Sequence, residues 1–440
     1  MTFNRRTFLK TAALGGLAEL EAYPQNVNRN SKPSDLKITD LRVAVLREGK
    51  STWTRTMIRL DTNQGIRGYG EGYMGGSPTS ALFLKSRLVG QNPCSVDKVF
   101  RKIKQFGFHA RQGGGVSGVE AALWDLAGKA YGVPVHQMLG GKFRDRIRLY
   151  GEGENSPDPK IYGASLKKRI DAGFTMVKMD LGTPLIDKVP GAISRPLGLT
   201  QGEIGFTEHM FTGYELTDKG ISLMADYVAQ VREIIGMEVP LSADHFGHIG
   251  VNSCIRLGRA LQKFNMAWLE DMVPWSRVAQ WKQITDAIDV PTLVGEDVYL
   301  KGPFEALCKA QAIDMIHPDP QVCGGILEIK RMGDMAQEYG VAMNLHCAAT
   351  PVGYMAGVHA AAATENFMAL EGHTPEPPFW NDMVDGVSKP IMDRGFIQVP
   401  EGPGLGVTVN EEVLRPYCVG GLFAPTPEWD KEWAWDRLWS

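Results

Sequence analysis

Three short apolar runs in the middle of this chain each end in a carboxylate and recur at equal intervals. They span residues 240–244, 266–270 and 291–296, so the acids at positions 244, 270 and 296 stand 26 residues apart. The intervening segments, 252–264 and 275–288, have the composition of helices. A strand–helix period of roughly 25 to 45 residues is typical of successive units of a parallel β/α barrel. The pattern therefore predicts three adjacent barrel strands.

The three acids are Asp244, Glu270 and Glu296, and each would lie at the carboxyl end of its strand. Barrel enzymes carry their active sites at that end. Three carboxylates that converge there repel one another unless a cation joins them, and all-oxygen ligation suits a hard ion such as Mg²⁺. We therefore predict one Mg²⁺ per subunit on these acids. The alternative is three unrelated, solvated acids at strand ends.

Further strand-like runs extend the barrel over residues 148–375. They lie at 148–150, 175–180, 314–318, 341–346 and 367–371. The insertion 181–218 is rich in Gly, Pro and Thr and is long for a barrel loop. At the catalytic end we interpret it as a lid over the substrate, with a disordered surface insert as the alternative.

Residues 36–147 show a different order of elements. Alternating apolar residues predict a strand meander that ends at the glycine-rich stretch 70–76, and helical patterns follow, most clearly at 116–131. Strands followed by helices predict a separate α+β domain before the barrel. After Glu371 the alternation stops, and we expect residues 376–440 to pack back on this first domain.

Residues 1–35 resemble a targeting signal and linker. The sequence Asn4-Arg-Arg-Thr-Phe-Leu-Lys10 is similar to a twin-arginine export motif, and a run of small residues follows it. The motif predicts export to the periplasm. Because Glu19 and Glu21 interrupt the apolar run, the alternative is a disordered basic tail on a cytoplasmic protein.

Composition argues against several classes of partner. The formal net charge is −3, and Lys and Arg form no stripe in the sequence, so we expect no nucleic acid. No run reaches the roughly 18 apolar residues of a membrane span. The six cysteines form no CxxC pair, which argues against a zinc knuckle.

Lys178 and Asp180 stand two residues apart in the second predicted strand. That spacing points both side chains to one face, here the barrel mouth. Lys178 can neutralise a substrate carboxylate. Asp180 could accept a proton, orient a hydroxyl or form a structural ion pair with Lys178.

Two further strand ends carry proton-transfer candidates. His346 ends the seventh strand and Asp319 follows the sixth, which suits a general base oriented by a carboxylate. Glu371 ends the eighth strand and is expected across the ring from the neighbours of the second. If protonated, it could hydrogen-bond a developing enolate oxygen. His245, directly after Asp244, is a further candidate acid, although strand alternation would point it away from the metal side.

These residues resemble the enolase superfamily, in its mandelate racemase/muconate lactonizing branch, over about residues 36–420. The motifs are Gly118–Lys129, Gly132-Val-Pro-Val, Leu139–Arg146, Trp268-Leu-Glu270, Gly295-Glu296, Pro318-Asp319, His346 and Leu370-Glu371. The resemblance implies an α/β fold, a modified (β/α)7β TIM barrel with an N-terminal α+β capping domain. It also implies Mg²⁺ on the three acids, abstraction of a proton α to a carboxylate to give a metal-stabilised enolate, and a homo-oligomer.

The chain departs from the racemases of this branch at the second strand. They carry Lys-x-Lys, whose second lysine is a base, whereas Asp180 stands there in this chain. One base plus an acid fits β-elimination of water from a sugar acid. We expect His346 to remove the α proton, and His346 or a lid residue to protonate the departing 3-hydroxyl.

Three alternatives stay open at this point. A racemase, epimerase or cycloisomerase would use Asp180 and His346 on opposite faces. A sugar-acid-binding protein would keep the fold without catalysis. A metal-dependent hydrolase would usually need His-x-His at the first strand, where the chain has Tyr150-Gly-Glu152.

Overall fold

The computed structural model describes residues 31–49, 53–73, 75–194, 215–244, 246, 249–373 and 377–431. Outside these ranges lie the predicted export motif, residues 195–214 of the insertion, His245 and residues 432–440. Export and the lid therefore stay predictions. Within the described ranges, no helix is long and apolar enough to cross a membrane.

Eight parallel strands close into a barrel. They are β4 (Arg146–Glu152), β5 (Val177–Asp180), β8 (Leu241–Asp244), β9 (Met266–Glu270), β10 (Thr292–Val294), β11 (Met315–Ile316), β12 (Ala342–Leu345) and β13 (Phe367–Gly372). The ring closes because β4 pairs in parallel with both β5 and β13. One further strand, β15 (Phe396–Gln398), pairs antiparallel with β4.

Helices connect successive strands of the barrel. They are α7 (Pro159–Asp171), α9 (Asp218–Ile235), α10 (Val251–Leu261), α11 (Val278–Thr285), α12 (Lys301–Lys309), α13 (Ile326–Glu338) and α14 (Pro351–Ala363). Each begins after the carboxyl end of a strand, and the described residues between β13 and β15 include one short 3-10 helix, η7 (Trp380–Met383), but no α-helix. The predicted (β/α)7β order of the α/β fold is thereby confirmed.

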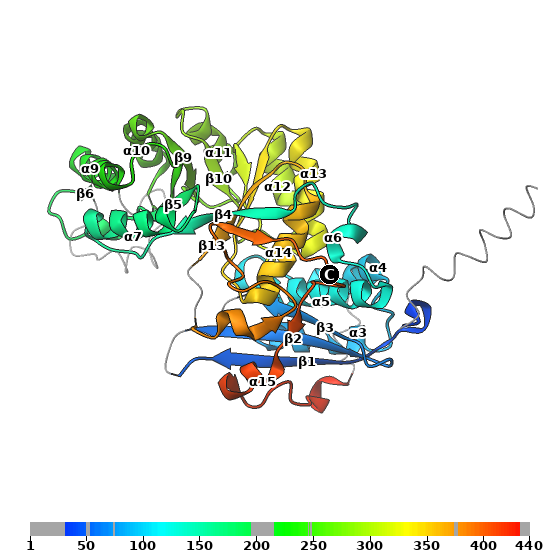
Figure 1. Cartoon of the computed structure of the whole chain (residues 1–440). Helices are drawn as coiled ribbons and strands as arrows, with labels where there is room; N and C mark the ends of the chain where they lie inside the picture. The colour runs from blue at the N-terminus through cyan, green and yellow to red at the C-terminus, as the bar shows by residue number, and fades with distance from the viewer. Residues whose placement is uncertain are drawn as a thin grey trace, which may run out of the picture.

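An antiparallel sheet precedes the barrel and lies below it in Figure 1. Its strands are β1 (Ile38–Arg47), β2 (Thr54–Thr62) and β3 (Arg67–Gly72), and β17 (Cys418–Val419) pairs with β1, so the C-terminal segment adds a strand. Helix α5 (Gly114–Tyr131) packs closely on β3. A Cβ at Gly70 would lie 1.9 Å from the Gly118 carbonyl oxygen, so the two backbones can approach only at a glycine.

Two acids of this first domain bind the starts of barrel helices. Glu71 of β3 accepts hydrogen bonds from Thr350 N and Gly353 N at the start of α14 (2.9 and 3.1 Å). Glu120 of α5 accepts from Ile326 N and Leu327 N at the start of α13 (2.8 and 3.1 Å). Carboxylates satisfy the unpaired N–H groups of a helix start and complement its dipole. The first domain is therefore anchored at the catalytic end of the barrel.

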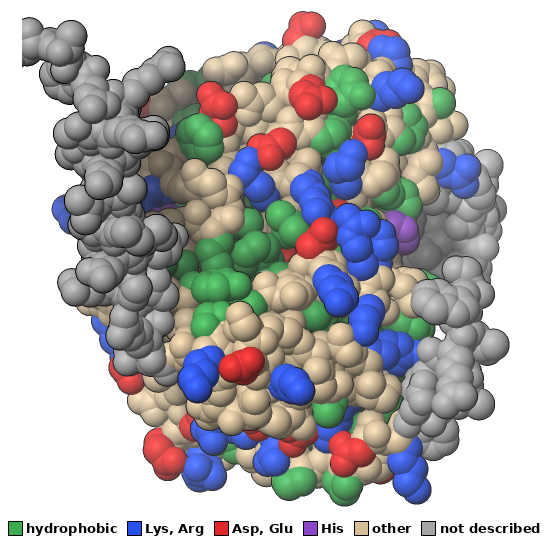
Figure 2. Space-filling view, turned by 90° about the vertical axis from the view of Figure 1, so that its right-hand side faces the viewer, with side chains coloured by type: hydrophobic (Ala, Val, Ile, Leu, Met, Phe, Trp, Pro, Cys, Tyr) green, Lys and Arg blue, Asp and Glu red, His purple; other side chains and the backbone are tan. Residues whose placement is uncertain are grey.

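Figure 2 shows the face of the molecule on the right-hand side of Figure 1. Hydrophobic side chains gather in a hollow on this face, beside a band of Lys and Arg with acidic side chains among them. An apolar groove of about 550 Å³ is lined by Trp124 and Tyr131 of α5, Leu327 of α13, and Met138, among others.

Candidate active site

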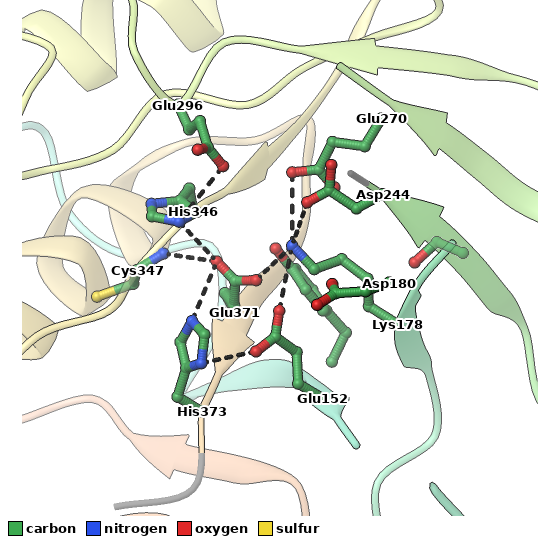
Figure 3. Close-up of polar contacts among 12 residues, drawn as sticks. Glu152, Lys178, Asp180, Asp244, Glu270, Glu296, His346, Cys347, Glu371 and His373 are labelled. Atoms are coloured by element: carbon green, nitrogen blue, oxygen red, sulfur yellow. Dashed lines mark hydrogen bonds and ion pairs between the residues drawn. The ribbon is translucent and has the colours of Figure 1, made fainter. Parts of the chain in front are cut away.

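Charged side chains from the carboxyl ends of all eight barrel strands meet in one cluster, part of which is shown in Figure 3. In strand order they are Glu152, Lys178, Asp180, Asp244, Glu270, Glu296, His317, Asp319, His346, Glu371 and His373. The alternation of side chains along each strand places these groups in the mouth of the barrel. The predicted site residues on described strands are therefore brought together.

Lys178 is the centre of this cluster. Its side chain is 2% exposed, and Nζ lies 2.7 Å from Glu371 Oε1, 3.1 Å from Asp244 Oδ2, 3.3 Å from Glu152 Oε1 and 3.5 Å from Glu270 Oε1. Burial alone would lower the pKa of Lys178, but the carboxylates, led by Glu270, hold that pKa well above its usual value. One ammonium thus contacts acids from four strands and offsets part of their negative charge.

Glu270 lies between this ammonium and an unpredicted histidine. Its Oε2 accepts a hydrogen bond from Trp268 Nε1 (3.0 Å), and its Oε1 is 2.9 Å from His317 Nδ1. Burial would raise the pKa of Glu270, but His317 and Lys178 outweigh burial and lower that pKa to about 2. Glu270 is therefore ionised near neutral pH.

The donor set of the predicted metal ligands fits a hard cation. Glu270 Oε1 is buried and accepts no well-aligned hydrogen bond; its neighbours are His317 Nδ1 at 2.9 Å and Lys178 Nζ at 3.5 Å, and a lone pair is left for a cation. Glu270, Glu296 and His317 each offer a ligand atom, and these atoms lie within 4.8 Å of one another. Asp244 is linked to Glu270 through Lys178, which contacts both carboxylates.

The backbone conformation of Gly295 positions Glu296 in the cluster. Gly295 follows β10 with φ +147°, where a Cβ would lie 2.4 Å from the Phe304 ring. Only glycine makes this turn without strain, and the turn directs Glu296 into the cluster. Burial raises the pKa of Glu296, and a cation beside this acid would lower that pKa again.

His346 is oriented as an acid–base group. Its Nδ1 lies 2.5 Å from Asp319 Oδ2, and Asp319 Oδ1 accepts from Gln321 N. With Nδ1 so engaged, Nε2 faces the site, 3.4 Å from Glu296 Oε2 and 3.3 Å from Glu371 Oε2. Burial would lower the pKa of His346, but these carboxylates hold it well above its usual value.

Glu371 does not lie across the ring from the neighbours of the second strand, as the strand order suggests, and its surroundings favour the charged form over the protonated one. Because β13 closes the ring onto β4, Glu371 lies beside Lys178 rather than across the barrel, and its Oε2 also accepts from Cys347 N (3.1 Å). Burial would raise the pKa of Glu371, but Lys178, His346 and His373 hold it well below its usual value. Glu371 is a carboxylate that bridges the ammonium and the imidazole.

Asp180 has a different setting from Lys178. Its Oδ2 accepts a hydrogen bond from Asn155 Nδ2, and its backbone N–H donates to Tyr162 Oη. The ion pairs of Lys178 run to Glu152, Asp244, Glu270 and Glu371. The structural Lys178–Asp180 pair that the spacing allowed is therefore not formed.

Sequence reasoning missed three members of the cluster. Glu152 ends β4 in register with Lys178, and its Oε2 lies 2.7 Å from His373 Nδ1. His317 follows β11 directly, with Nε2 2.8 Å from Tyr150 Oη. The rule that site residues lie at the carboxyl ends of the barrel strands, here called the strand-end rule, would also have predicted Glu152. His373 stands two residues after Glu371, and this spacing in a strand would have predicted that it lies on the same face.

His346, Glu371 and His373 form a second group of ligand atoms within 4.8 Å of one another. Its two imidazoles would suit Zn²⁺ better than Mg²⁺. Of the four carboxylates around Lys178, Glu371 makes the shortest contact with the ammonium, at 2.7 Å. We therefore interpret this group as proton-transfer residues.

Comparison with known proteins identifies the relatives of this chain. Residues 37–140 match the mandelate racemase/muconate lactonizing enzyme N-terminal domain, and residues 162–413 match the enolase C-terminal domain-like family. A D-xylonate dehydratase of Haloferax volcanii is 30% identical over 88% of this chain and 90% of the relative. A D-galactonate dehydratase of Verminephrobacter eiseniae is 28% identical over 81% of this chain and 89% of the relative.

Solved structures agree with this picture. A mandelate racemase/muconate lactonizing enzyme-like protein from Rubrobacter xylanophilus superposes with a TM-score of 0.76 at 28% identity, covering 88% of this chain and 99% of that one. The 3,6-anhydro-D-galactonate cycloisomerase from Zobellia galactanivorans has a TM-score of 0.71 at 23% identity, covering 87% of this chain and 99% of that one. At that identity the second likeness shows the fold alone.

Proposed function

Because the chain belongs to the mandelate racemase/muconate lactonizing enzyme family of the enolase superfamily, we propose that it is a Mg²⁺-dependent dehydratase of a sugar acid. Relatives named as D-xylonate and D-galactonate dehydratases support the reaction class. The observation that carries the proposal is that the Asp319-oriented His346 and the ammonium of Lys178 lie at the barrel mouth on the two oxygens of Glu371.

Asp244, Glu270 and Glu296 are the residues that would hold Mg²⁺. When bound, the ion supplies positive charge against the carboxylate of the substrate and stabilises the charge that develops when the α proton leaves. A cation bound to Glu296 would also offset one of the carboxylate charges that raise the pKa of His346, which favours the neutral imidazole that a base requires.

Each side chain of the cluster has a separate role in this proposed reaction. Lys178 neutralises the substrate carboxylate from the side of β5. His346 Nε2 takes the α proton, while Asp319 holds the ring and stabilises the imidazolium that forms. Glu371 keeps Lys178 and His346 in fixed positions through its two oxygens, 2.7 and 3.3 Å from them.

A reaction that needs two bases on opposite faces receives less support. Asp180 accepts a hydrogen bond from Asn155, and Lys178 is paired with other acids. One oriented base with acids nearby is the arrangement that elimination of water requires. A single-base dehydration is therefore the function that the geometry favours.

The test is His346→Asn against a panel of aldonates and aldarates with Mg²⁺ present. We expect the wild type to form a 2-keto-3-deoxy acid and the variant to lose about 10²- to 10⁴-fold in kcat, the usual contribution of general acid–base catalysis. His136→Asn, which removes a buried histidine remote from the cluster, is the control and should retain activity.

Three results would contradict the proposal. Full turnover by His346→Asn would remove this histidine from its role. Solvent deuterium at the α carbon without loss of water would indicate an epimerase. A wild type that binds sugar acids but converts none would indicate a binding protein.

A further inference from the structure

The cluster contains a second carboxylate–imidazole pair that the reaction above does not use. His373 follows β13, and its Nδ1 lies 2.7 Å from Glu152 Oε2 at the end of β4. This contact repeats the one between His346 and Asp319 (2.5 Å). The two rings stand 6.5 Å apart at an interplanar angle of 77°, and both approach Glu371 (Figure 3).

The free nitrogen of His373 is directed into the cluster. Its Nε2 is a buried atom without a hydrogen-bond partner and lies 3.8 Å from Glu371 Oε2, while His346 Nε2 lies 3.3 Å from the same oxygen. A buried polar atom left without a partner is costly unless a ligand completes it. The two nitrogens flank one carboxylate oxygen and can serve neighbouring atoms of one bound molecule.

The two histidines differ in their access to solvent. The side chain of His346 is 8% exposed, and that of His373 is 35% exposed. A group that delivers a proton in every turnover must regain one from water, and His373 is the better placed of the two. Glu152 and Glu371 stabilise its protonated ring from two sides.

We propose, as an extension that rests on the proposed dehydration, that His373 is the general acid that protonates the departing 3-hydroxyl, with Glu152 as its positioning residue. His346 Nε2 takes the proton from C2, and the electron pair of that bond becomes the C2–C3 double bond as the C3–O bond breaks. The departing oxygen takes the proton of His373 Nε2 and leaves as water.

The remaining protons balance without any co-reactant. The enol product loses its C2 hydroxyl proton and gains one at C3, which gives the 2-keto-3-deoxy acid. His346 returns one proton to solvent and His373 takes one up in each cycle. No oxidant or reductant is needed, because elimination of water changes no overall oxidation state.

The experiment separates the acid from the base by changing the leaving group. The substrate is the sugar acid that the wild type dehydrates in the panel, compared with its 3-deoxy-3-fluoro analogue, because fluoride leaves without a proton and both compounds yield the same keto acid. His373→Gln should lose about 10²-fold or more on water elimination and keep fluoride elimination near the wild-type rate. His346→Asn, the matched control, should lose both.

Glu152→Gln provides the second measurement. Glu152 also contacts Lys178 at 3.3 Å, so this variant slows both leaving groups, but water elimination should fall further than fluoride elimination because His373 loses its partner. The readout is the ratio of the water-elimination rate to the fluoride-elimination rate. This ratio in Glu152→Gln tests the role of His373 even when His373→Gln does not fold.

An unchanged ratio in the two variants would overturn the role of His373, even with the dehydration itself intact. A wild type that dehydrates no sugar acid would instead overturn the proposed function. The two failures are therefore distinguishable.

Discussion

Replacing Lys178 by methionine tests whether one ammonium holds the acids of the barrel mouth together. Methionine has a similar length and no charge. Lys178 is 2% exposed and lies within 3.5 Å of four carboxylates. Removing one partner of a buried ion pair costs about 3–5 kcal/mol. We expect a loss of that size at pH 7 without Mg²⁺, measured by urea unfolding.

The pH dependence of this loss follows from the pKa shifts. In the wild type the pKa of Glu270 is lowered to about 2 and that of Glu371 lies well below its usual value. Such acids stabilise the fold above the unfolded pKa, about 4.3, and the stabilisation is lost as pH falls through the folded pKa. The Glu270 shift corresponds to roughly 3 kcal/mol. Between pH 7 and 5 the wild type therefore keeps this contribution.

The stability of Lys178→Met should instead rise as pH falls from 7 to 5. Without the ammonium, we expect burial to outweigh His346 and His373 and to raise the folded pKa of Glu371 above the unfolded value, so that the folded state binds more protons and gains stability as pH falls from 7 to 5. The deficit relative to the wild type should shrink over this window. Asp271 and Glu296, whose pKa values are raised in the wild type, act on both proteins, so the difference between the two curves reports mainly Lys178.

Lys282→Met is the matched control. Lys282 is 45% exposed and pairs with Asp286 at 2.9 Å on the surface of α11 and the turn after it, and such a pair contributes about 0–1 kcal/mol. If Lys178→Met were as stable as Lys282→Met at pH 7, or if its deficit did not shrink toward pH 5, the central role of Lys178 would be refuted.

Three further predictions follow from the same contacts. Mg²⁺ at about 100 times its Kd should stabilise the wild type by about 2.7 kcal/mol and Glu296→Gln by clearly less, measured as a shift in Tm; equal shifts would remove Glu296 from the metal site. Glu71→Gln should lower the free energy of unfolding by about 1–3 kcal/mol, measured with urea, because it disturbs a buried hydrogen-bond acceptor at the start of α14. The control Glu412→Gln changes an exposed side chain and should leave that free energy almost unchanged. N-ethylmaleimide should modify only the half-buried Cys94 and Cys418 in the native protein. Burial raises the pKa of Cys347 well above its usual value, so this thiol should not react. Detection of modified Cys347 by peptide mass spectrometry would contradict that environment.

The strand-end rule carries the part of the site that local pattern can predict. Lys178, Asp244, Glu270 and His346 are found because side chains alternate along a strand and the carboxyl ends of parallel strands meet in one place. Both facts depend only on neighbouring residues and on the strand–helix period. The barrel order follows for the same reason, and the structure confirms it.

The sequence by itself determined which residues stand at strand ends, since strand period and alternation are local properties of the chain. Only the tertiary structure decided their charge states and partners. Closure of the ring sets Glu371 of the last strand beside Lys178 and brings His373 to Glu152 of the first strand. Contacts across more than two hundred residues, such as Glu71 to Thr350, depend on how complete elements pack, and burial together with neighbouring charge then sets each pKa.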